Sequence, residues 1–238
     1  MAPESGFNGI LVVDKEKDWT SHDVCAFVKS RFRIKKVGHA GTLDPLATGI
    51  LVVLLGQATK KSRELSSCDK DYFGTLELGL KTDSQDITGK LLEKKEWQHV
   101  TERSLRETFE KFTGSLEQTP PMVSALKHQG VRLYQLARAG KVVEREKRAI
   151  TVYELRIEEI NFPHVRFFAR VSKGTYLRTL VNDIGEMLGS FAVLTDLRRV
   201  RSGAFSLADA APIVELRKMD HNQLKNVIKQ VPVSIVVG

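Results

Sequence analysis

The sequence predicts an α+β fold in which a mixed β-sheet is combined with helices. Segments that alternate as strands do are interspersed with segments of helical spacing, and no regular β-α-β order connects them. The 238 residues contain no internal repeat and no low-complexity tract. A chain of this length buries a full core without disulfides, so we expect one domain over residues 1–238.

The charge balance is basic, with 37 Lys and Arg residues against 29 Asp and Glu residues and a net charge of +8 at pH 7. Five of the eight residues 29–36 are Lys or Arg, and Arg198, Arg199 and Arg201 form a second cluster. Basic chains attract polyanions because each neutralised phosphate releases condensed counterions. Charge alone fits a nucleic-acid partner and a merely soluble basic surface equally well.

The cysteine content and the apolar runs exclude several classes of protein. Cys25 and Cys68 form no CxxC pair, so the sequence contains neither a disulfide scaffold nor the spacing of a zinc site. The N-terminal residues MAPESGFNG lack the charged and then apolar pattern of a signal peptide. The longest apolar run, residues 50–55, is too short to cross a bilayer. We therefore expect a cytoplasmic protein that does not bind membranes.

The N-terminal elements frame one irregular segment. Residues 10–13 are a predicted strand, Thr20 or Ser21 caps a predicted helix, and residues 50–55 are a predicted strand with both faces buried. Between them, GHAGTLDPLATG at 38–49 is expected to lack regular structure, because three glycines and an Asp-Pro step break both periodicities.

The remaining segments complete the predicted sheet and its helices. Residues 72–80 alternate, so that Tyr72 shares the parity of three leucines. Asp83 and Asp86 are interpreted as turn residues, because the other acidic positions of a calcium loop are missing. Residues 118–149 are polar, basic and flanked by prolines, which indicates an exposed lobe or a mobile arm rather than core. The other predicted elements are a helix capped by Thr101 and ended by Gly114, strands at 150–160 and 165–172 with Val165, Phe167, Ala169 and Val171 facing inward, and a helix that opens at Thr175.

Asp44 lies in the irregular segment next to a buried strand, where functional groups are commonly held. Three interpretations of this carboxylate are open. As a turn residue before proline it is ordinary. As the acid of a glycosidase it needs a second carboxylate nearby, and the segment supplies none. As a nucleophile it needs to stay ionised on a rigid loop with an arginine partner, and the sequence fits this interpretation best.

Arg178 is expected in the first turn of its helix, where the helix dipole disfavours a cation. A solvated arginine and an arginine that faces an anion are about equally compatible with this position. In the second case the anion is a phosphate or Asp44, and a bidentate guanidinium would keep that carboxylate ionised and oriented.

Five segments together resemble the TruB family of tRNA pseudouridine synthases, in order and with family-like spacing from about Gly9 to Phe205. They are the catalytic-aspartate motif GHAGTLDPLATGIL, the tyrosine motif DKDYFGTLELGLKTDSQDITG, the RNA-gripping arm PPMVSALKHQGVRLYQLARAGKVVER, the arginine motif SKGTYLRTLVNDIGE and the closing segment LTDLRRVRSG. The resemblance implies the pseudouridine synthase fold, a mixed and largely antiparallel sheet flanked by helices and loops around a central RNA-binding cleft.

The resemblance also implies an activity: an isomerase that flips the T-loop uridine of tRNA, position 55, and converts it to pseudouridine without a metal or an organic cofactor. Asp44 matches the nucleophile, Arg178 its ion-pair partner and Tyr72 the residue that stacks on the uracil. The matching RNA contacts are His39, Tyr176 and Leu197 around the flipped nucleotide, Lys60 at a phosphate, and Arg132 and Arg199 in the basic clusters. The implied partner is the T-arm of tRNA, with no obligate protein partner, and we expect a monomer.

The chain departs from the family pattern in two places. In DKEKDWTS, Glu16 and Asp18 replace the usual proline and glycine, which leaves any role of Lys15 open. Residues 206–238 are expected to be a short tail, without the PUA-type RNA-binding domain that bacterial members commonly carry. Two rival functions stay open at this point: a non-catalytic module that grips or folds tRNA, and a related synthase that acts on other RNAs.

Overall fold

The computed structural model describes residues 6–231, so the first residues of MAPESGFNG and the end of the predicted tail, 232–238, lie outside the described residues. The chain divides into two compact units, one of Met1–Phe73 with Leu197–Gly238 and one of Gly74–Asp196. Strands β4 (Lys70–Leu78) and β12 (Ala192–Ser202) continue from one unit into the other. Parallel and antiparallel strand pairs occur with helices between them, which confirms the predicted α+β class with a mixed sheet.

In the first unit the strand order is β14-β1-β3-β12, with β2 also on β3 and β13 also on β12. β1 pairs antiparallel with β3, from Gly9 opposite Leu55 to Lys15 opposite Gly49. Both faces of β3 are buried, as its unbroken apolar run predicts, so it anchors the core of this unit. The bounds of these strands are β1 Gly9–Lys15, β2 Val37–Ala40, β3 Thr48–Leu55, β13 Phe205–Ser206 and β14 Ala211–Pro212.

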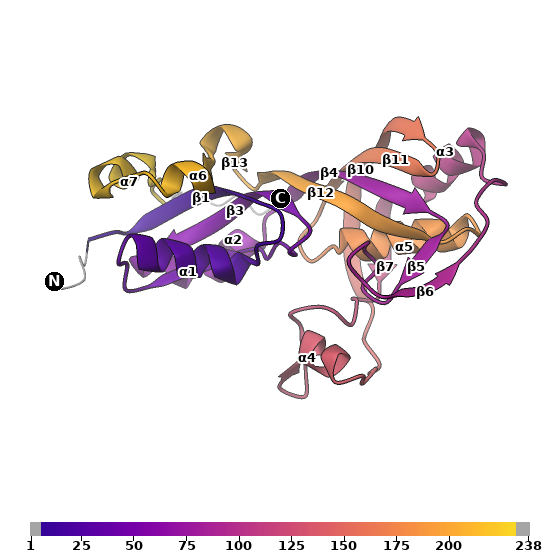
Figure 1. Cartoon of the computed structure of the whole chain (residues 1–238), viewed down its shortest axis with the longest axis horizontal. Helices are drawn as coiled ribbons and strands as arrows, with labels where there is room; N and C mark the ends of the chain where they lie inside the picture. The colour runs from indigo at the N-terminus through magenta and orange to yellow at the C-terminus, as the bar shows by residue number, and fades with distance from the viewer. Residues whose placement is uncertain (1–5, 232–238) are drawn as a thin grey trace. The chain divides into compact units, whose positions relative to one another are not determined.

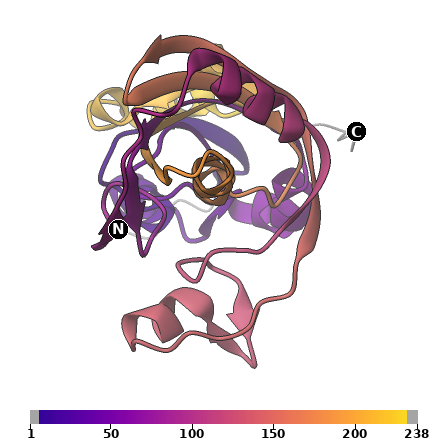
Figure 2. The same cartoon turned by 90° about the vertical axis from the view of Figure 1, so that its right-hand side faces the viewer.

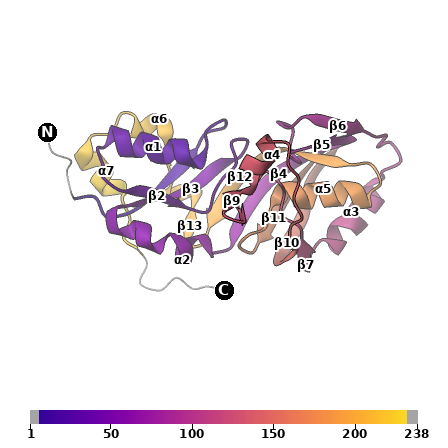
Figure 3. The ribbon, with the colours of Figure 1, turned by 90° about the horizontal axis from the view of Figure 1, so that it is seen from below.

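The helices of the first unit begin at local caps. Thr20 is the N-cap of α1 (Ser21–Arg31), where its side chain accepts from the Asp23 amide and the Asp23 carboxylate accepts from the Thr20 amide. This capping box confirms the predicted helix start. In Figure 3, β2 lies between α1 and α2, and both helices contact it. The remaining helices are the 3₁₀-helix η1 Gly56–Lys61, α2 Ser62–Ser66, the 3₁₀-helix η2 Leu207–Asp209, α6 Ile213–Leu216 and α7 His221–Val227.

The prediction that 38–49 lacks regular structure is wrong at both ends. Residues 38–40 belong to β2, in which His39 pairs opposite Val53, and β3 already begins at Thr48. A short strand that contains glycine is stabilised here by pairing with a buried neighbour, which local sequence does not reveal. The irregular part is 41–47 alone.

In the second unit the strand order is β4-β11-β10-β7, and β10 pairs antiparallel with both β11 and β7. The four predicted inward residues of β11 are all buried, which confirms the alternation. Phe109 of α3 packs edge-on against Phe167 of β11, with ring centroids 6.3 Å apart. Bounds here are β7 Gly114–Gln118, β10 Arg148–Asn161, β11 His164–Val171, α3 Glu102–Lys111 and the hairpin strands β5 Leu80–Thr82 and β6 Leu91–Lys94.

Helix α5 (Leu177–Met187), seen end-on in Figure 2, buries the predicted apolar stripe that includes Leu180 and Ile184. It begins two residues after the predicted Thr175, with Tyr176 as its N-cap. The Thr101 cap of α3 is confirmed. That helix ends at Lys111, and Gly114 starts the next strand instead of closing the helix.

The predicted arm, 118–149, is exposed over most of its length and extends away from the strands of its unit (Figure 1). It contains the short hairpin β8 (Lys127–His128) and β9 (Val131–Arg132), followed by α4 (Leu133–Arg138). None of the helices within residues 6–231 combines the length and apolar character needed to span a bilayer.

Candidate active site

The loop that carries Asp44 is a turn that packs against the core of the first unit. The Ala47 amide donates to the Asp44 carbonyl over 3.1 Å, which closes the turn across the Asp-Pro step. Leu43 and Leu46 are buried on either side, whereas the Asp44 side chain is only half-buried. The backbone is therefore fixed while the carboxylate stays accessible.

Polar groups from neighbouring elements brace the same loop. The Ser21 hydroxyl donates to the Leu43 carbonyl (3.0 Å) and accepts from the Leu43 amide (2.8 Å). The Gly41 amide donates to the Ser66 hydroxyl over 3.1 Å. These bonds satisfy the backbone of a segment that has no strand or helix partner of its own.

Lys15 is a functional candidate that the sequence left open. Its side chain is only 1% exposed, and its ammonium donates to the carbonyls of Glu16, Trp19 and Pro45 at 2.9, 2.6 and 3.3 Å. Burial lowers the pKa of Lys15 to about 8, and the carboxylate of Asp44 opposes that shift. A buried cation therefore lies under the loop at the residue that follows Asp44.

Arg199 braces the other side of the loop. It is 0% exposed, and its guanidinium donates to the carbonyls of Ile50 (2.7 Å) and Gly41 (3.0 Å). The sequence predicts Arg199 as an RNA contact, but a side chain this buried has no surface for a phosphate, so the structure gives it a supporting role. Its neighbours are also engaged internally: Arg198 pairs with Asp14 and Arg201 with Asp71, each at 2.7 Å.

The other predicted RNA contacts of the first unit differ in exposure. Within residues 6–231 the buried Nδ1 of His39 makes no hydrogen bond, and burial, followed by the charge of Arg199, lowers the pKa of this imidazole. Lys60 is exposed on η1, whereas Tyr72 on β4 and Leu197 on β12 are buried.

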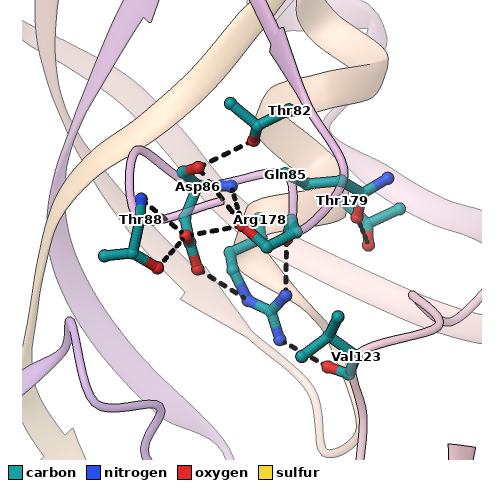
Figure 4. Close-up of polar contacts among 8 residues, drawn as sticks. Thr82, Gln85, Asp86, Thr88, Val123, Arg178 and Thr179 are labelled. Atoms are coloured by element: carbon teal, nitrogen blue, oxygen red, sulfur yellow. Dashed lines mark hydrogen bonds and ion pairs between the residues drawn. The ribbon is translucent and has the colours of Figure 1, made fainter. Parts of the chain in front are cut away.

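Arg178 occupies the first turn of α5, as predicted, and is 2% exposed. Its guanidinium donates to the Ser84 carbonyl over 2.6 Å. Figure 4 shows its contacts with the Val123 carbonyl (2.9 Å) and with Asp86, whose Oδ2 lies 3.7 Å from Nε. Backbone acceptors and a carboxylate thus hold the cation where the helix dipole alone would disfavour it.

Asp86 was missed as a site residue, because the sequence shows it only as a turn residue. It is 5% exposed, and its Oδ1 accepts from the Ser84 hydroxyl and from the amide and hydroxyl of Thr88 (Figure 4). Asp83, in contrast, is exposed and caps the Lys90 amide as an ordinary turn residue does. The signal in the sequence is that Asp86 is the last acid of the tyrosine motif, and its partner Arg178 is far along the chain.

Tyr176 is fixed by a buried glutamine that the sequence did not single out. The Tyr176 amide donates to Oε1 of Gln118 over 2.8 Å, and Nε2 of Gln118 donates to the Tyr176 carbonyl over 3.1 Å. Arg132 lies exposed on β9, where its guanidinium donates to the Ala125 carbonyl. Like Lys60, it is a predicted RNA contact whose side chain is exposed.

The predicted site residues thus form two groups, one in each unit, that neighbouring residues hold in place. In the first unit, Asp44 is held on a braced loop with His39 in the adjoining strand. In the second, Arg178 and Tyr176 are fixed at the start of α5. The ion pair expected between Asp44 and Arg178 joins residues of different units and stays a prediction.

Two family models match consecutive parts of the chain. The TruB family pseudouridylate synthase (N terminal domain) model matches residues 29–177, and the tRNA pseudouridylate synthase B C-terminal domain model matches residues 178–234.

Curated relatives named tRNA pseudouridine synthase B are similar over most of the chain. The relative from Geobacter sulfurreducens is 48% identical over 212 residues, which are 89% of this chain and 70% of that protein. The relative from Geotalea uraniireducens is 51% identical over 203 residues, 85% of this chain and 66% of that protein. The relative from Opitutus terrae is 46% identical over 208 residues, which are 87% of this chain and 86% of that protein. The chain therefore spans between 66% and 86% of the length of these three relatives.

Solved structures share the fold. A Cbf5-Nop10-Gar1 complex superposes with a TM-score of 0.74 at 27% identity, covering 96% of this chain and 65% of that chain. An H/ACA RNP bound to a substrate RNA containing 2'-deoxyuridine gives a TM-score of 0.68 at 26% identity, with 96% and 62% coverage. Together with the family models, these likenesses confirm the predicted fold.

Proposed function

The chain belongs to the TruB family of pseudouridylate synthases, a family of isomerases, and on that premise we propose that it converts the T-loop uridine at position 55 of tRNA to pseudouridine. The names of its relatives support tRNA as the substrate, and the resemblance of its motifs supports the T-loop position. We further propose that it acts as a monomer in the cytoplasm.

The observation that carries the proposal is the braced loop of Asp44. A carboxylate nucleophile has to be ionised and held in one orientation before substrate arrives. Lys15, Ser21 and Arg199 fix the backbone on both sides of Asp44, while its side chain remains half-buried. A module that only grips RNA has no use for a carboxylate fixed in this way.

In the proposed reaction the N1–C1′ glycosidic bond breaks, the uracil turns and a C5–C1′ bond forms. The C5 proton leaves to solvent, and the freed N1 takes up a proton from solvent. Asp44 attacks either C1′ of the ribose or C6 of the uracil and is released when the new bond is complete. Arg178, held by Asp86 and two carbonyls, is the proposed ion-pair partner of Asp44. No atom is gained or lost overall, so the reaction needs no co-reactant.

The other residues bind the flipped nucleotide and its backbone in this proposal. Extruding a base costs a few kcal/mol, and stacking on an aromatic ring such as Tyr72 offsets about 1–3 kcal/mol of it. His39, Tyr176 and Leu197 complete the proposed base pocket. Lys60 and Arg132, both exposed, are the proposed phosphate contacts. Arg199 is left out of this set because its guanidinium is engaged internally.

Of the two rival functions, a synthase for other RNAs is disfavoured by the degree of similarity. Identity to the curated tRNA enzymes is 46–51%, against 27% to the Cbf5 complex. The other rival, a non-catalytic module that grips or folds tRNA, is distinguished from the enzyme by the following experiment.

The test is tritium release from tRNA that carries [5-³H]uridine, measured with the wild type and with Asp44→Asn, followed by mapping of the modified position. We expect release by the wild type at the T-loop and a loss of at least about 10⁴-fold in the variant, because an amide cannot act as the nucleophile. Asp220→Asn is the matched control, since asparagine caps α7 as well as aspartate does.

Three outcomes contradict parts of the proposal. Release mapped outside the T-loop overturns the substrate but keeps the chemistry. Equal release by the wild type and Asp44→Asn overturns the nucleophile. A wild type that binds tRNA tightly and releases no tritium is the RNA-gripping module.

A further inference from the structure

Gln118 connects the root of the arm to the start of α5. It is the last residue of β7 and the first residue of the arm, and its side chain is 3% exposed. Resting on the proposed function, we propose that Gln118 is a positioning residue for the reaction: its amide sets Tyr176, and through the first turn of α5 it sets Arg178.

The contact is a reciprocal pair of hydrogen bonds to one residue. Oε1 of Gln118 accepts from the Tyr176 amide at 2.8 Å, and Nε2 donates to the Tyr176 carbonyl at 3.1 Å. A side-chain amide is the group that satisfies an extended peptide from one side in this way, because it holds a donor and an acceptor in one plane. Leucine offers neither group, and an ionised glutamate offers only acceptors.

These two hydrogen bonds affect the reaction because they lie at the start of α5. Tyr176 is the N-cap, with φ −100° and ψ 108°, so the change from extended to helical backbone occurs directly after it. Arg178 is the second helical residue. Fixing both backbone groups of Tyr176 therefore fixes the direction from which the Arg178 side chain leaves the helix.

A second contact ties the same stretch of the arm to Arg178. The Val123 carbonyl, five residues after Gln118, accepts from Nη2 of Arg178 at 2.9 Å (Figure 4). Both ends of the 118–123 stretch are thus bonded to residues that the proposed reaction uses. A displacement of this stretch would therefore reach Tyr176 and Arg178 through these two contacts.

The decisive variant is Gln118→Glu, because its hydrogen bonding depends on pH. A neutral carboxyl donates and accepts as the amide does, whereas the ionised form cannot donate to the Tyr176 carbonyl. Burial and the facing carbonyl of Tyr176 favour the neutral form. The charged groups on the neighbouring elements include Arg148, which is exposed and opposite Gln118 in β10, and Arg178 in α5, and neither guanidinium bonds to Gln118 among the described residues. The single-turnover rate of Gln118→Glu, divided by that of the wild type at the same pH, should therefore rise as pH falls from 8 to 6.

Gln118→Leu and a matched control complete the experiment. We expect Gln118→Leu to lose about tenfold or more in single-turnover rate at every pH, with the tRNA Kd changed by less than about threefold. Thr108→Val, which removes a buried hydroxyl that donates to the Ser104 carbonyl on α3 of the same unit, should keep the wild-type rate.

The outcomes separate this inference from the function on which it rests. Recovery of Gln118→Glu at low pH, with Gln118→Leu slow throughout and still binding tRNA, supports the positioning role. Wild-type rates in Gln118→Leu overturn the inference alone. Losses in Gln118→Leu that are matched by Thr108→Val, or explained by a reduced folded fraction, also overturn it. No tritium release by the wild type overturns the proposed function and this inference together.

Discussion

At the scale of single residues, Lys15 has the clearest consequence that does not depend on RNA. Burial lowers its pKa from 10.5 to about 8, so between these pH values the unfolded chain binds a proton that the folded chain does not. Stability then rises with pH across this window, because the cost of burying the charge disappears as the ammonium deprotonates. Below pH 8 both states are protonated, and the cost is constant.

We therefore predict that the unfolding free energy of the wild type minus that of Lys15→Met increases from pH 8 to pH 10 and is flat from pH 6 to pH 7.5. Urea unfolding of both proteins at each pH measures the difference. Lys17→Met is the control, since Lys17 is exposed. A difference that falls as pH rises would show that the ammonium is stabilised in the folded protein.

The residues that the sequence identified and those it missed differ in what defines them. Asp44 and Arg178 lie in motifs whose local composition marks them as unusual. Lys15, in contrast, bonds to Pro45 from 30 residues away, and Asp86 pairs with Arg178 on a helix far along the chain. Their roles, like that of Gln118, come from contacts that form only in the folded chain, so no window of sequence reveals them.

At the scale of elements, the start of β3 depends on one glycine. Gly49 has a φ of +93°, and a Cβ there would lie 2.2 Å from the Arg199 carbonyl of β12. The close approach lets β12 pair parallel with β3 at Thr48 and Gly49. The glycine thus connects the Asp44 loop to the strand that braces it.

We predict that Gly49→Ala destabilises the protein by about 2–5 kcal/mol, from left-handed strain of about 1–2 kcal/mol and a backbone clash of about 1–3 kcal/mol. Gly130→Ala, also at positive φ but with nothing within 4 Å of the new Cβ, should lose only the strain. Urea unfolding of both variants measures the two costs. Equal losses of unfolding free energy in the two variants would mean that β12 moves away from the new methyl group without an energetic penalty.

The starts of α1 and α3 were predictable at this scale, whereas strand β2 was not. The caps at Thr20 and Thr101 are local signals, because a hydroxyl and the amide three residues on are neighbours in sequence. Strand β2 is not a local signal. Residues 37–40 contain a glycine and a histidine, and their extended conformation is stabilised by β3.

At the scale of the whole molecule, surface charge sets the affinity for RNA in the proposed function. The arginines at 198–201 bind internal partners, so the exposed arm carries more of the available positive charge than the sequence suggests. We predict that Arg132→Ala weakens tRNA binding and reduces the slope of log K against log salt by about 0.7–0.9. Filter binding of tRNA to the wild type and the variant between 50 and 300 mM salt measures both the affinity and this slope.

Arg103→Ala on α3 is the control for that slope, because Arg103 is exposed and pairs with Glu107 outside the arm. An unchanged slope in Arg132→Ala would remove Arg132 from the RNA contacts.

The fold class followed from composition and periodicity, whereas the strand order did not. Alternation predicts that a strand exists and which face is buried, but not its neighbour. β12 meets β3 at Arg198 and Thr48, which are 150 residues apart, and it has the charged composition of an exposed loop. Pairings of this kind depend on the whole chain, which is why the sheet was predicted as a class and not as an order.

The contact of Arg199 with the Gly41 carbonyl also determines when the Asp44 loop becomes rigid during synthesis of the chain. The guanidinium that holds the Gly41 carbonyl belongs to a residue made 158 positions later in the chain. While a ribosome is still translating β11 and α5, the Asp44 turn has Ser21 and Lys15 but lacks its third support. Such long-range closure is slow in folding. The carboxylate therefore acquires its final geometry only after Arg199 has been made, and a chain that stops short of Arg199 carries the aspartate motif without a rigid nucleophile.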